Sequence, residues 1–238
     1  VLNKREVNIT TIEDPVEYDM EGVAQIQVNE KTGLTFAKGL RSIVRQDPDI
    51  IMVGEIRDSE TASIGVNAAM TGHLVLSTLH TNDAATAFPR LQDMEVEDFL
   101  IASTVNVIVA QRLVRKVCAN CIQSTSVDDL TSELLEHNPR VKQYLLDATG
   151  KKTTRGVTVY KGKGCHVCHQ SGYHGRIGIF EVLFVDESIR EAVMAHKNAD
   201  EIRELSVKEG MSTMVYDGVL RVTTGITTLE EVLRVTTE

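Results

Sequence analysis

Acidic and imidazole side chains stand at the carboxyl ends of three expected strands of this sequence, and side chains of these types can hold a metal–phosphate centre. The three positions are Glu13, Glu55 and His80. Carboxylates are ligands that Mg²⁺ prefers, and basic groups compensate the charge that develops during phosphoryl transfer. If the fold gathers the three positions at one edge, the sequence therefore predicts a site that can hold a metal–phosphate centre.

The acids around Glu55 carry this pattern most clearly. In QDPDIIMVGEIRD (residues 46–58) an apolar run lies between Asp49 and Glu55. An acid at the carboxyl end of a buried strand lies where open α/β sheets bind ligands. The alternative is a solvated loop in which Glu55 pairs with Arg57. In the same way, Glu13 could cap a turn, and His80 could be a hydrogen-bonded interior histidine.

Four cysteines form a second group of residues whose types and spacing could do chemistry. They are Cys118, Cys121, Cys165 and Cys168, two C-x-x-C pairs. Two such pairs in a chain without a secretion signal indicate metal binding before disulfides, and four thiolates satisfy tetrahedral Zn²⁺ with no open position. We therefore predict a structural zinc site. A redox dithiol would account for one pair but not for two, and His166 or His169 could replace a cysteine only if a thiol were missing.

The elements that must position these residues alternate between strand and helix. Strands are expected at 7–12, 24–28, 49–53 and 73–78, and helices are expected from Thr35, over 59–70 and around 84–91. This alternation continues to about residue 112 and predicts an α/β fold with a mostly parallel sheet. The continuous apolar runs 50–53 and 74–76 predict strands that are buried on both faces.

The second half of the sequence differs from the first in its polarity and in its expected secondary structure. Residues 124–156 are polar with two helical stretches, so we expect a small helical insertion between the cysteine pairs. RIGIFEVLFV (176–185) is typical of a strand, and the tail is helical with breaks at Gly210 and Gly225. We predict three regions: an α/β core over 1–115, a cysteine module over 116–184 and a helical region over 185–238.

Composition limits the classes of partner. The chain has 238 residues, of which 42% are hydrophobic and 25% charged, and its formal net charge is −9. An acidic chain with 4% aromatic residues and no Trp is not expected to bind nucleic acid, which requires clustered cations or stacking platforms. There is no secretion signal and no apolar run long enough to span a bilayer. We therefore expect a soluble, cytoplasmic protein.

A phosphate-binding loop is missing from the sequence. The pattern G-x-x-x-x-G-K-[ST] does not occur, and the nearest stretch, GKKT at 150–153, has Lys where the Mg²⁺-binding Ser or Thr should stand. The sequence also begins at Val1, just before a strand. We expect the chain to be a fragment whose phosphate loop lies upstream.

The order of the motifs resembles the secretion ATPase superfamily, in particular the assembly ATPases of type II secretion and type IV pili. ITTIEDPVEY (9–18) resembles the Asp box, RQDPDIIMVGEIRD (45–58) the Walker B motif and TGHLVLSTLHTNDA (71–84) the His box. QRLVRKVCANC (111–121) and GKGCHVCHQSGYHGRIGIFEVL (162–183) resemble the tetracysteine module, and VTTGITTLEEVLRVT (222–236) resembles the closing helix. The resemblance covers essentially the whole chain.

This resemblance implies a RecA-like core, usually hexameric, with ATP bound between subunits. Glu55 would orient Mg²⁺ and water, Glu13 would act as a base or position the water, and His80 would contact the γ-phosphate region. Further nucleotide-site candidates follow from the boxes and from arginine positions of the family: Asp14, Glu17, Asp49, His73, Arg90 and Arg176. Arg41 and Arg45, which share a helix face, could compensate charge across a subunit interface.

The function implied is ATP hydrolysis that powers pilus or pseudopilus assembly, by a cytoplasmic protein peripheral at the inner membrane with an assembly-platform protein as partner. Without its phosphate loop the fragment is expected to be inactive alone. The alternative is a non-catalytic, zinc-stabilised docking module for the same platform. A DNA-translocating motor is disfavoured by the acidic charge, and a retraction motor by the four cysteines. Secretion, pilus extension and DNA uptake are not distinguished.

Overall fold

The computed structural model describes residues 2–127 and 129–236, which form two compact units. The first unit contains Val1–Ile108 and Phe184–Ser206, and the second contains Val109–Leu183 and Val207–Glu238. The expected tail region is thus divided between the units. Val1 and the last two residues of that tail lie outside the described residues.

The first unit is built on a parallel sheet. Its strands are β1 (Ile9–Glu13), β2 (Val23–Gln27), β3 (Ile50–Val53) and β4 (Leu74–Ser77), in the order β2-β1-β3-β4. The register pairs Ile12 with Ile26 and Val53, and Val53 with Ser77. All four strands were predicted within a few residues, and the predicted α/β fold class is confirmed.

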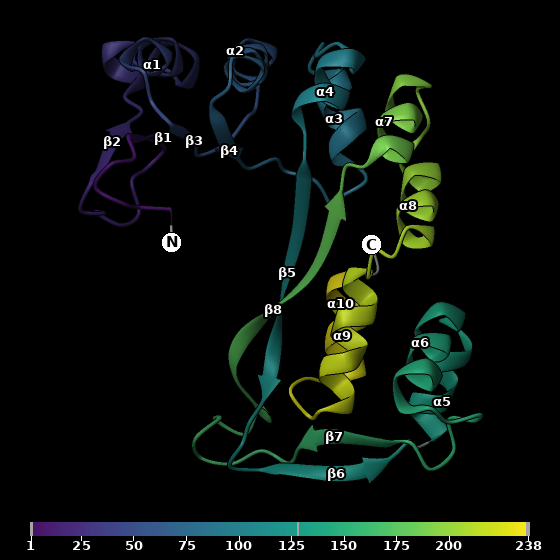
Figure 1. Cartoon of the computed structure of the whole chain (residues 1–238). Helices are drawn as coiled ribbons and strands as arrows, with labels where there is room; N and C mark the ends of the chain where they lie inside the picture. Colours follow the sequence, from purple (N-terminus) through teal and green to yellow (C-terminus); the bar gives the residue numbers. More distant parts are fainter. Residues whose placement is uncertain (1, 128, 237–238) are drawn as a thin grey trace. The chain divides into compact units, whose positions relative to one another are not determined.

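Helices α1 (Phe36–Ile43) and α2 (Ser59–Met70) lie side by side on one face of this sheet (Figure 1). The predicted N-cap Thr35 accepts a hydrogen bond from the backbone N–H of Lys38, and Asp58 caps α2 in the same way. At Gly39 an added Cβ would lie 2.1 Å from Cδ1 of Ile12. A larger residue at this position would therefore have to displace the Ile12 side chain where α1 packs on β1.

The remaining elements of this unit follow the sheet. The short 3₁₀ turns η1 (Glu30–Thr32) and η2 (Val44–Gln46) flank α1, while α3 (Ala87–Asp93), α4 (Asp98–Thr104) and α7 (Glu187–Met194) form a further layer with α4 packed on α2 and α7. Helix α8 (Ala199–Lys208) follows α7. Among these elements Phe88 and Ile101 are fully buried, so this layer belongs to the core of the unit.

One burial prediction is wrong. The apolar run 74–76 was expected to be covered on both faces, but Leu74 and Leu76 are 44% and 43% exposed. Strand β4 is the edge strand of the described sheet, so it has a single neighbouring strand. By contrast, β3 lies between β1 and β4 and is buried as predicted. The local sequence does not reveal which of two similar apolar strands lies at the edge.

Within its described residues, the second unit contains two pairs of strands and four helices. Strand β5 (Val107–Val117) pairs with β8 (Tyr173–Phe184), and β6 (Ile122–Ser126) pairs in antiparallel fashion with β7 (Thr158–Gly162). The predicted helical insertion forms α5 (Asp129–Glu136) and α6 (Pro139–Thr149), and the end of the chain forms α9 (Met214–Thr223) and α10 (Leu229–Thr236). Strand β8 was predicted, whereas β6 and β7 were not.

A single apolar core joins the insertion to the C-terminal helices. α6 packs against α9, and α9 packs against β7 (Figure 1). The buried residues of this core are Leu135, Val141, Leu145, Val157, Val159, Val219, Val222, Leu229, Val232 and Leu233. Gly218 makes the contact between α9 and α10 possible, because an added Cβ would lie 2.7 Å from Cγ1 of Val232. The insertion is therefore part of a packed core.

Candidate functional site

The carboxyl ends of β1, β3 and β4 meet at one edge of the sheet. The backbone N–H of Gly54 donates to the carbonyl of Ile12 at 2.8 Å, which continues the pairing of β1 with β3. The N–H of Ile56 donates to the carbonyl of Thr78 at 3.0 Å, and the Thr78 hydroxyl donates to the carbonyl of Gly54 at 2.6 Å. Hydrogen bonds immediately around Glu55 thus hold the ends of the three strands together.

Gly54 allows the backbones to approach closely at this edge. A Cβ at this position would lie 3.2 Å from the carbonyl oxygen of Ile12 and 3.3 Å from Cα of Glu13. Both distances are shorter than ordinary van der Waals contacts, and both involve backbone atoms that cannot rotate away. Glycine therefore lets the chain that carries Glu55 run directly beside Glu13.

Glu55 is buried and bears two hydrogen bonds on the same oxygen. Its Oε2 accepts from Nε of Arg57 and lies 3.1 Å from Nε2 of His80. Because a carboxylate can only accept, Nε2 of His80 carries the proton in this contact. Burial acts to raise the pKa of Glu55, but the hydrogen bonds and charges of Arg57 and His80 outweigh it and lower the pKa. Glu55 is therefore a carboxylate at neutral pH.

Glu13 is buried on the neighbouring strand and has its own partners. Its Oε1 accepts from the hydroxyl of Thr11 at 2.5 Å and from Nε2 of Gln25 at 3.0 Å. Gln25 also donates to the carbonyl of Tyr18 and accepts from the N–H of Met20. It therefore joins Glu13 to the loop that follows β1. Neither Gln25 nor Thr11 was predicted from the sequence, although Gln25 occupies a polar position in the alternating pattern of β2.

The other predicted nucleotide-site residues lie in several places. Asp14 and Glu17 are exposed in the loop after β1, next to Glu13. Asp49 lies at the amino end of β3, where its carboxylate accepts from the N–H of Asn8 at 2.7 Å. His73 precedes β4, with Nδ1 2.8 Å from the carbonyl of Ala68. Asp49 and His73 thus lie at the sheet edge opposite Glu55.

The predicted arginines lie in different units. Arg90 is exposed on α3 of the first unit. Arg176, on β8 of the second unit, lines a cavity of about 590 Å³ together with Arg115, Tyr173 and Ser171. The guanidinium of Arg115 lies 4.2 Å from the centre of the Tyr173 ring. This cavity has a basic wall that the sequence reasoning did not predict beyond Arg176. Of the other two arginines considered, Arg41 pairs with Glu60 at 2.7 Å.

The four cysteines meet in the second unit. Their sulfur atoms lie within 4.8 Å of one another, with 3.9 Å between Cys118 and Cys165, 3.9 Å between Cys121 and Cys168, and 3.7 Å between Cys165 and Cys168. A tetrahedron of thiolates at about 2.3 Å from zinc has sulfur separations of roughly 3.8 Å. The donor set therefore fits one tetrahedral metal ion.

The backbone around the second cysteine pair favours thiolate. The N–H groups of Cys165 and Gly172 donate to Sγ of Cys168 at 3.2 and 3.3 Å. Burial acts to raise the pKa of Cys168, but these hydrogen bonds outweigh it and lower the pKa to about 6. Glycine is required here, since an added Cβ at Gly162 would lie 2.1 Å from the carbonyl oxygen of Gly172. The turn thus presents a sulfur atom that a metal ion could bind.

A comparison with known families identifies the family of the chain. The family model described as "Type II/IV secretion system protein" matches residues 1–234. The chain belongs to this family. The resemblance inferred from the sequence motifs is therefore confirmed.

Curated relatives extend beyond this chain. The type IV pilus assembly ATPase PilB of Thermus thermophilus is 50% identical over 97% of this chain and 25% of its own length. The type II secretion system protein E of Pectobacterium carotovorum is 46% identical, and the type II secretion system ATPase E of Vibrio cholerae 45% identical, each over 100% of this chain and 44% of its own length. The chain therefore spans less than half of each of these relatives.

Solved structures show the same fold. The chain superposes on the pilus retraction motor PilT with bound ADP with a TM-score of 0.66 and 26% identity, over 98% of this chain and 53% of PilT. The ATPase DotB of Legionella pneumophila matches with a TM-score of 0.61 at 22% identity, over 96% of this chain and 51% of DotB.

Within the described residues, no helix has the length and apolar character that crossing a membrane requires.

Proposed function

We propose that the chain is part of an ATP-hydrolysing motor that powers pilus or pseudopilus assembly, in type IV pilus biogenesis or type II secretion. The observation that carries the proposal is the sheet edge at which Glu55, bonded to His80, follows the strand next to that of Glu13. Family membership and relatives named as assembly and secretion ATPases support it.

In this proposal the nucleotide-site residues have distinct roles. The Glu55 carboxylate orients Mg²⁺ and the attacking water, and Glu13 positions or deprotonates that water. His80 contacts the γ-phosphate region of ATP. Asp14, Glu17, Arg90 and Arg176 contribute charge around the nucleotide, with arginines acting across a subunit interface. That Asp49 and His73 also contribute charge around the nucleotide stays a prediction. Their position at the opposite edge of the sheet does not support it.

The cysteine module holds Zn²⁺ as a structural ion in this proposal. Four thiolates complete the tetrahedron, so the ion has no open position for chemistry. The motor acts as a hexamer, located in the cytoplasm at the inner membrane, where it contacts an assembly-platform protein. ATP, and not nucleic acid, is the ligand. A purely docking role for the zinc module has no specific support beyond these observations.

The test is ATP hydrolysis by an extended chain, in which this chain replaces the matching 25% of the Thermus relative. We expect Mg²⁺-dependent hydrolysis, and we expect Glu55→Gln to lower kcat about a hundredfold or more, because the amide cannot replace the metal-orienting charge. The matched control is Glu187→Gln, which removes an exposed acid at the start of α7 in the same unit. Full activity in Glu55→Gln would refute the proposed function.

A further inference from the structure

The segment that carries His80 has no regular secondary structure between β4 and α3. The side chain of His80 is 79% exposed, while that of Glu55 is 11% exposed. An exposed ion pair or hydrogen bond contributes little by itself, since water competes for both partners. The contact with Glu55 therefore depends on how firmly the segment is held at its two ends.

The end nearer β4 is held by the site itself. Thr78 donates from its hydroxyl to the carbonyl of Gly54 and accepts from the N–H of Ile56. This anchor fixes the chain two residues before His80.

The other end is held by Asp83. Its Oδ1 accepts from the N–H of Thr86 at 2.9 Å and from the Thr86 hydroxyl at 2.6 Å. Thr81 also donates from its hydroxyl to the carbonyl of Asp83 at 3.1 Å. Asp83 thus fixes the turn that follows His80.

The second oxygen of Asp83 is bound by an arginine far along the chain. Nη2 of Arg203, on α8, lies 2.5 Å from Oδ2 of Asp83, and the two side chains are 28% and 23% exposed. Burial acts to raise the pKa of Asp83, but the bonds from Thr86 and the charge of Arg203 outweigh it and lower the pKa. Arg203 itself follows Ile202, which is buried and ties α8 to the unit.

We propose that Arg203 is a positioning residue for the His80 segment: by holding Asp83 it keeps the imidazole of His80 against Glu55. A helix of the C-terminal region thereby takes part in the arrangement of the nucleotide site without touching it. The effect on hydrolysis rests on the proposed function, whereas the effect on the position of His80 does not.

The first test uses the chain as it is, with the imidazole Cε1–Hε1 resonance of His80 as the readout. Glu55→Gln gives the reference displacement, because it removes the direct partner. We expect Arg203→Gln to displace the resonance by at least half of that amount and to speed amide exchange at Thr86 about tenfold, since its acceptor Asp83 is no longer held. Arg203→Lys should restore most of the wild-type position.

The matched control is Asp200→Asn. Asp200 binds Nη1 of the same arginine at 2.6 Å and its side chain is 83% exposed, so this variant removes a surface pair and leaves the bond to Asp83. We expect the His80 resonance to stay at its wild-type position. A wild-type resonance in folded Arg203→Gln, or an equal displacement in Asp200→Asn, would overturn the positioning role.

The second test is hydrolysis by the extended chain. Arg203→Gln should lower kcat about tenfold with KM for ATP within about twofold, because the variant misplaces a group and removes no ligand of the nucleotide. Normal kcat despite a displaced His80 would overturn the catalytic consequence. If Glu55→Gln were fully active, the proposed function would fail, while the resonance of His80 would still decide the positioning role.

Discussion

At the scale of the residue, each unit contains a buried carboxylate with cationic partners. Glu55 is held by Arg57 and His80, and Glu231 by Arg115 and Arg234. A buried carboxylate is costly unless it is paired and hydrogen-bonded, so each of these groups depends on its partners. Glu55 lies at the candidate site, whereas Glu231 joins α10 to β5 immediately before the cysteine module.

The charge of Glu231 should make stability depend on pH. Arg115 donates to it from the backbone N–H at 3.0 Å and from Nη2 at 2.5 Å, and Arg234 donates from Nε at 2.8 Å. Burial acts to raise the pKa of Glu231, but these bonds outweigh it and hold the pKa well below its ordinary value of 4.5. A lowered folded pKa contributes stability above the unfolded value, and this contribution is lost as pH falls below it.

We therefore expect Glu231→Gln to lower the free energy of unfolding by roughly 2 kcal/mol near neutral pH. The difference from wild type should shrink steadily below about pH 4.5, as measured by urea unfolding. Glu230→Gln is the control, because Glu230 is an exposed neighbour that lies 3.5 Å from Lys161. A difference that is independent of pH would contradict the role given to the charge.

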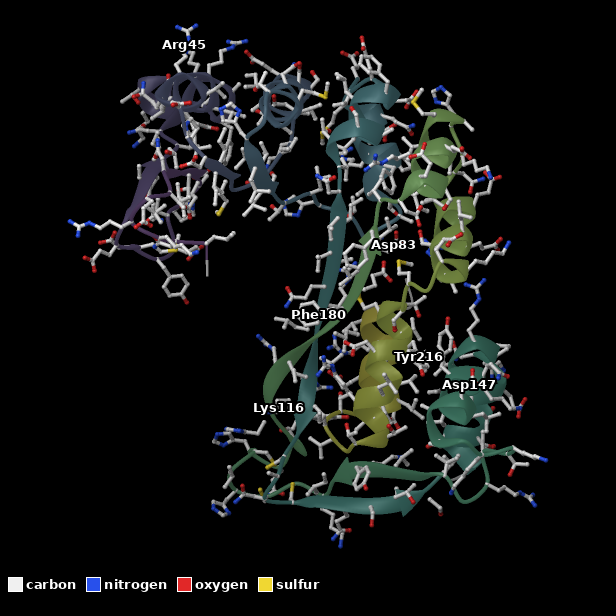
Figure 2. All side chains as sticks on the ribbon, viewed as in Figure 1. Arg45, Asp83, Lys116, Asp147, Phe180 and Tyr216 are labelled. Atoms are coloured by element: carbon white, nitrogen blue, oxygen red, sulfur yellow. The ribbon has the colours of Figure 1, made fainter. Side chains whose placement is uncertain are left out.

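At the scale of the element, glycines set how closely the strands and turns approach. Gly54 places β3 beside the end of β1, and the pair Gly162 and Gly172 closes the cysteine turn. Figure 2 shows sulfur atoms gathered beside the ends of β6 and β7, where this turn lies. In both places backbone proximity brings the functional side chains together.

Gly54→Ala tests this contact at the sheet edge. The added Cβ has to push against backbone atoms of Ile12 and Glu13, so we expect a loss of about 1–2 kcal/mol in the free energy of unfolding. The control is Gly65→Ala on α2, where the nearest atom to the added Cβ is 3.9 Å away. Alanine should be neutral or stabilising in that helix. Equal effects at the two positions would show that the close approach does not matter.

Metal removal tests the cysteine module. We expect one Zn²⁺ per chain by elemental analysis of protein purified without chelator, and a fall of several degrees in melting temperature after complete removal of the ion. Cys168→Ser should have a similar effect, since it removes a ligand that accepts two backbone hydrogen bonds. Protein that contains no zinc and melts unchanged after chelation would refute the predicted site.

At the scale of the whole molecule, local signals in the sequence predicted more than long-range ones. The apolar run of β3, the capping residue Thr35 and the spacing of the cysteines are local, and the structure places all of them as expected. Strands β6 and β7 were missed because IQSTS and TVYKG are largely polar and gain stability from pairing with each other.

The residues of the candidate site also fall into those with a local signal in the sequence and those that depend on long-range contacts. Glu13, Glu55 and His80 could be proposed as candidates because each follows a strand signal in its own motif. Their partners could not, because Gln25 acts across a strand pair and Arg203 lies 120 residues from Asp83. The two-segment composition of each compact unit was hidden for the same reason: contacts between distant segments leave no local pattern.

The central claim is that Glu55 and His80 work as one group at the edge of the sheet. A double-mutant cycle on kcat for ATP hydrolysis by the extended chain tests it most directly, with Glu55→Gln, His80→Gln and the double variant. Because His80 is held for its contact with the γ-phosphate region by the Glu55 carboxylate, its contribution depends on Glu55, and we predict that the double variant is at most about twofold slower than Glu55→Gln alone. Independent effects that multiply in the double variant would contradict the claim.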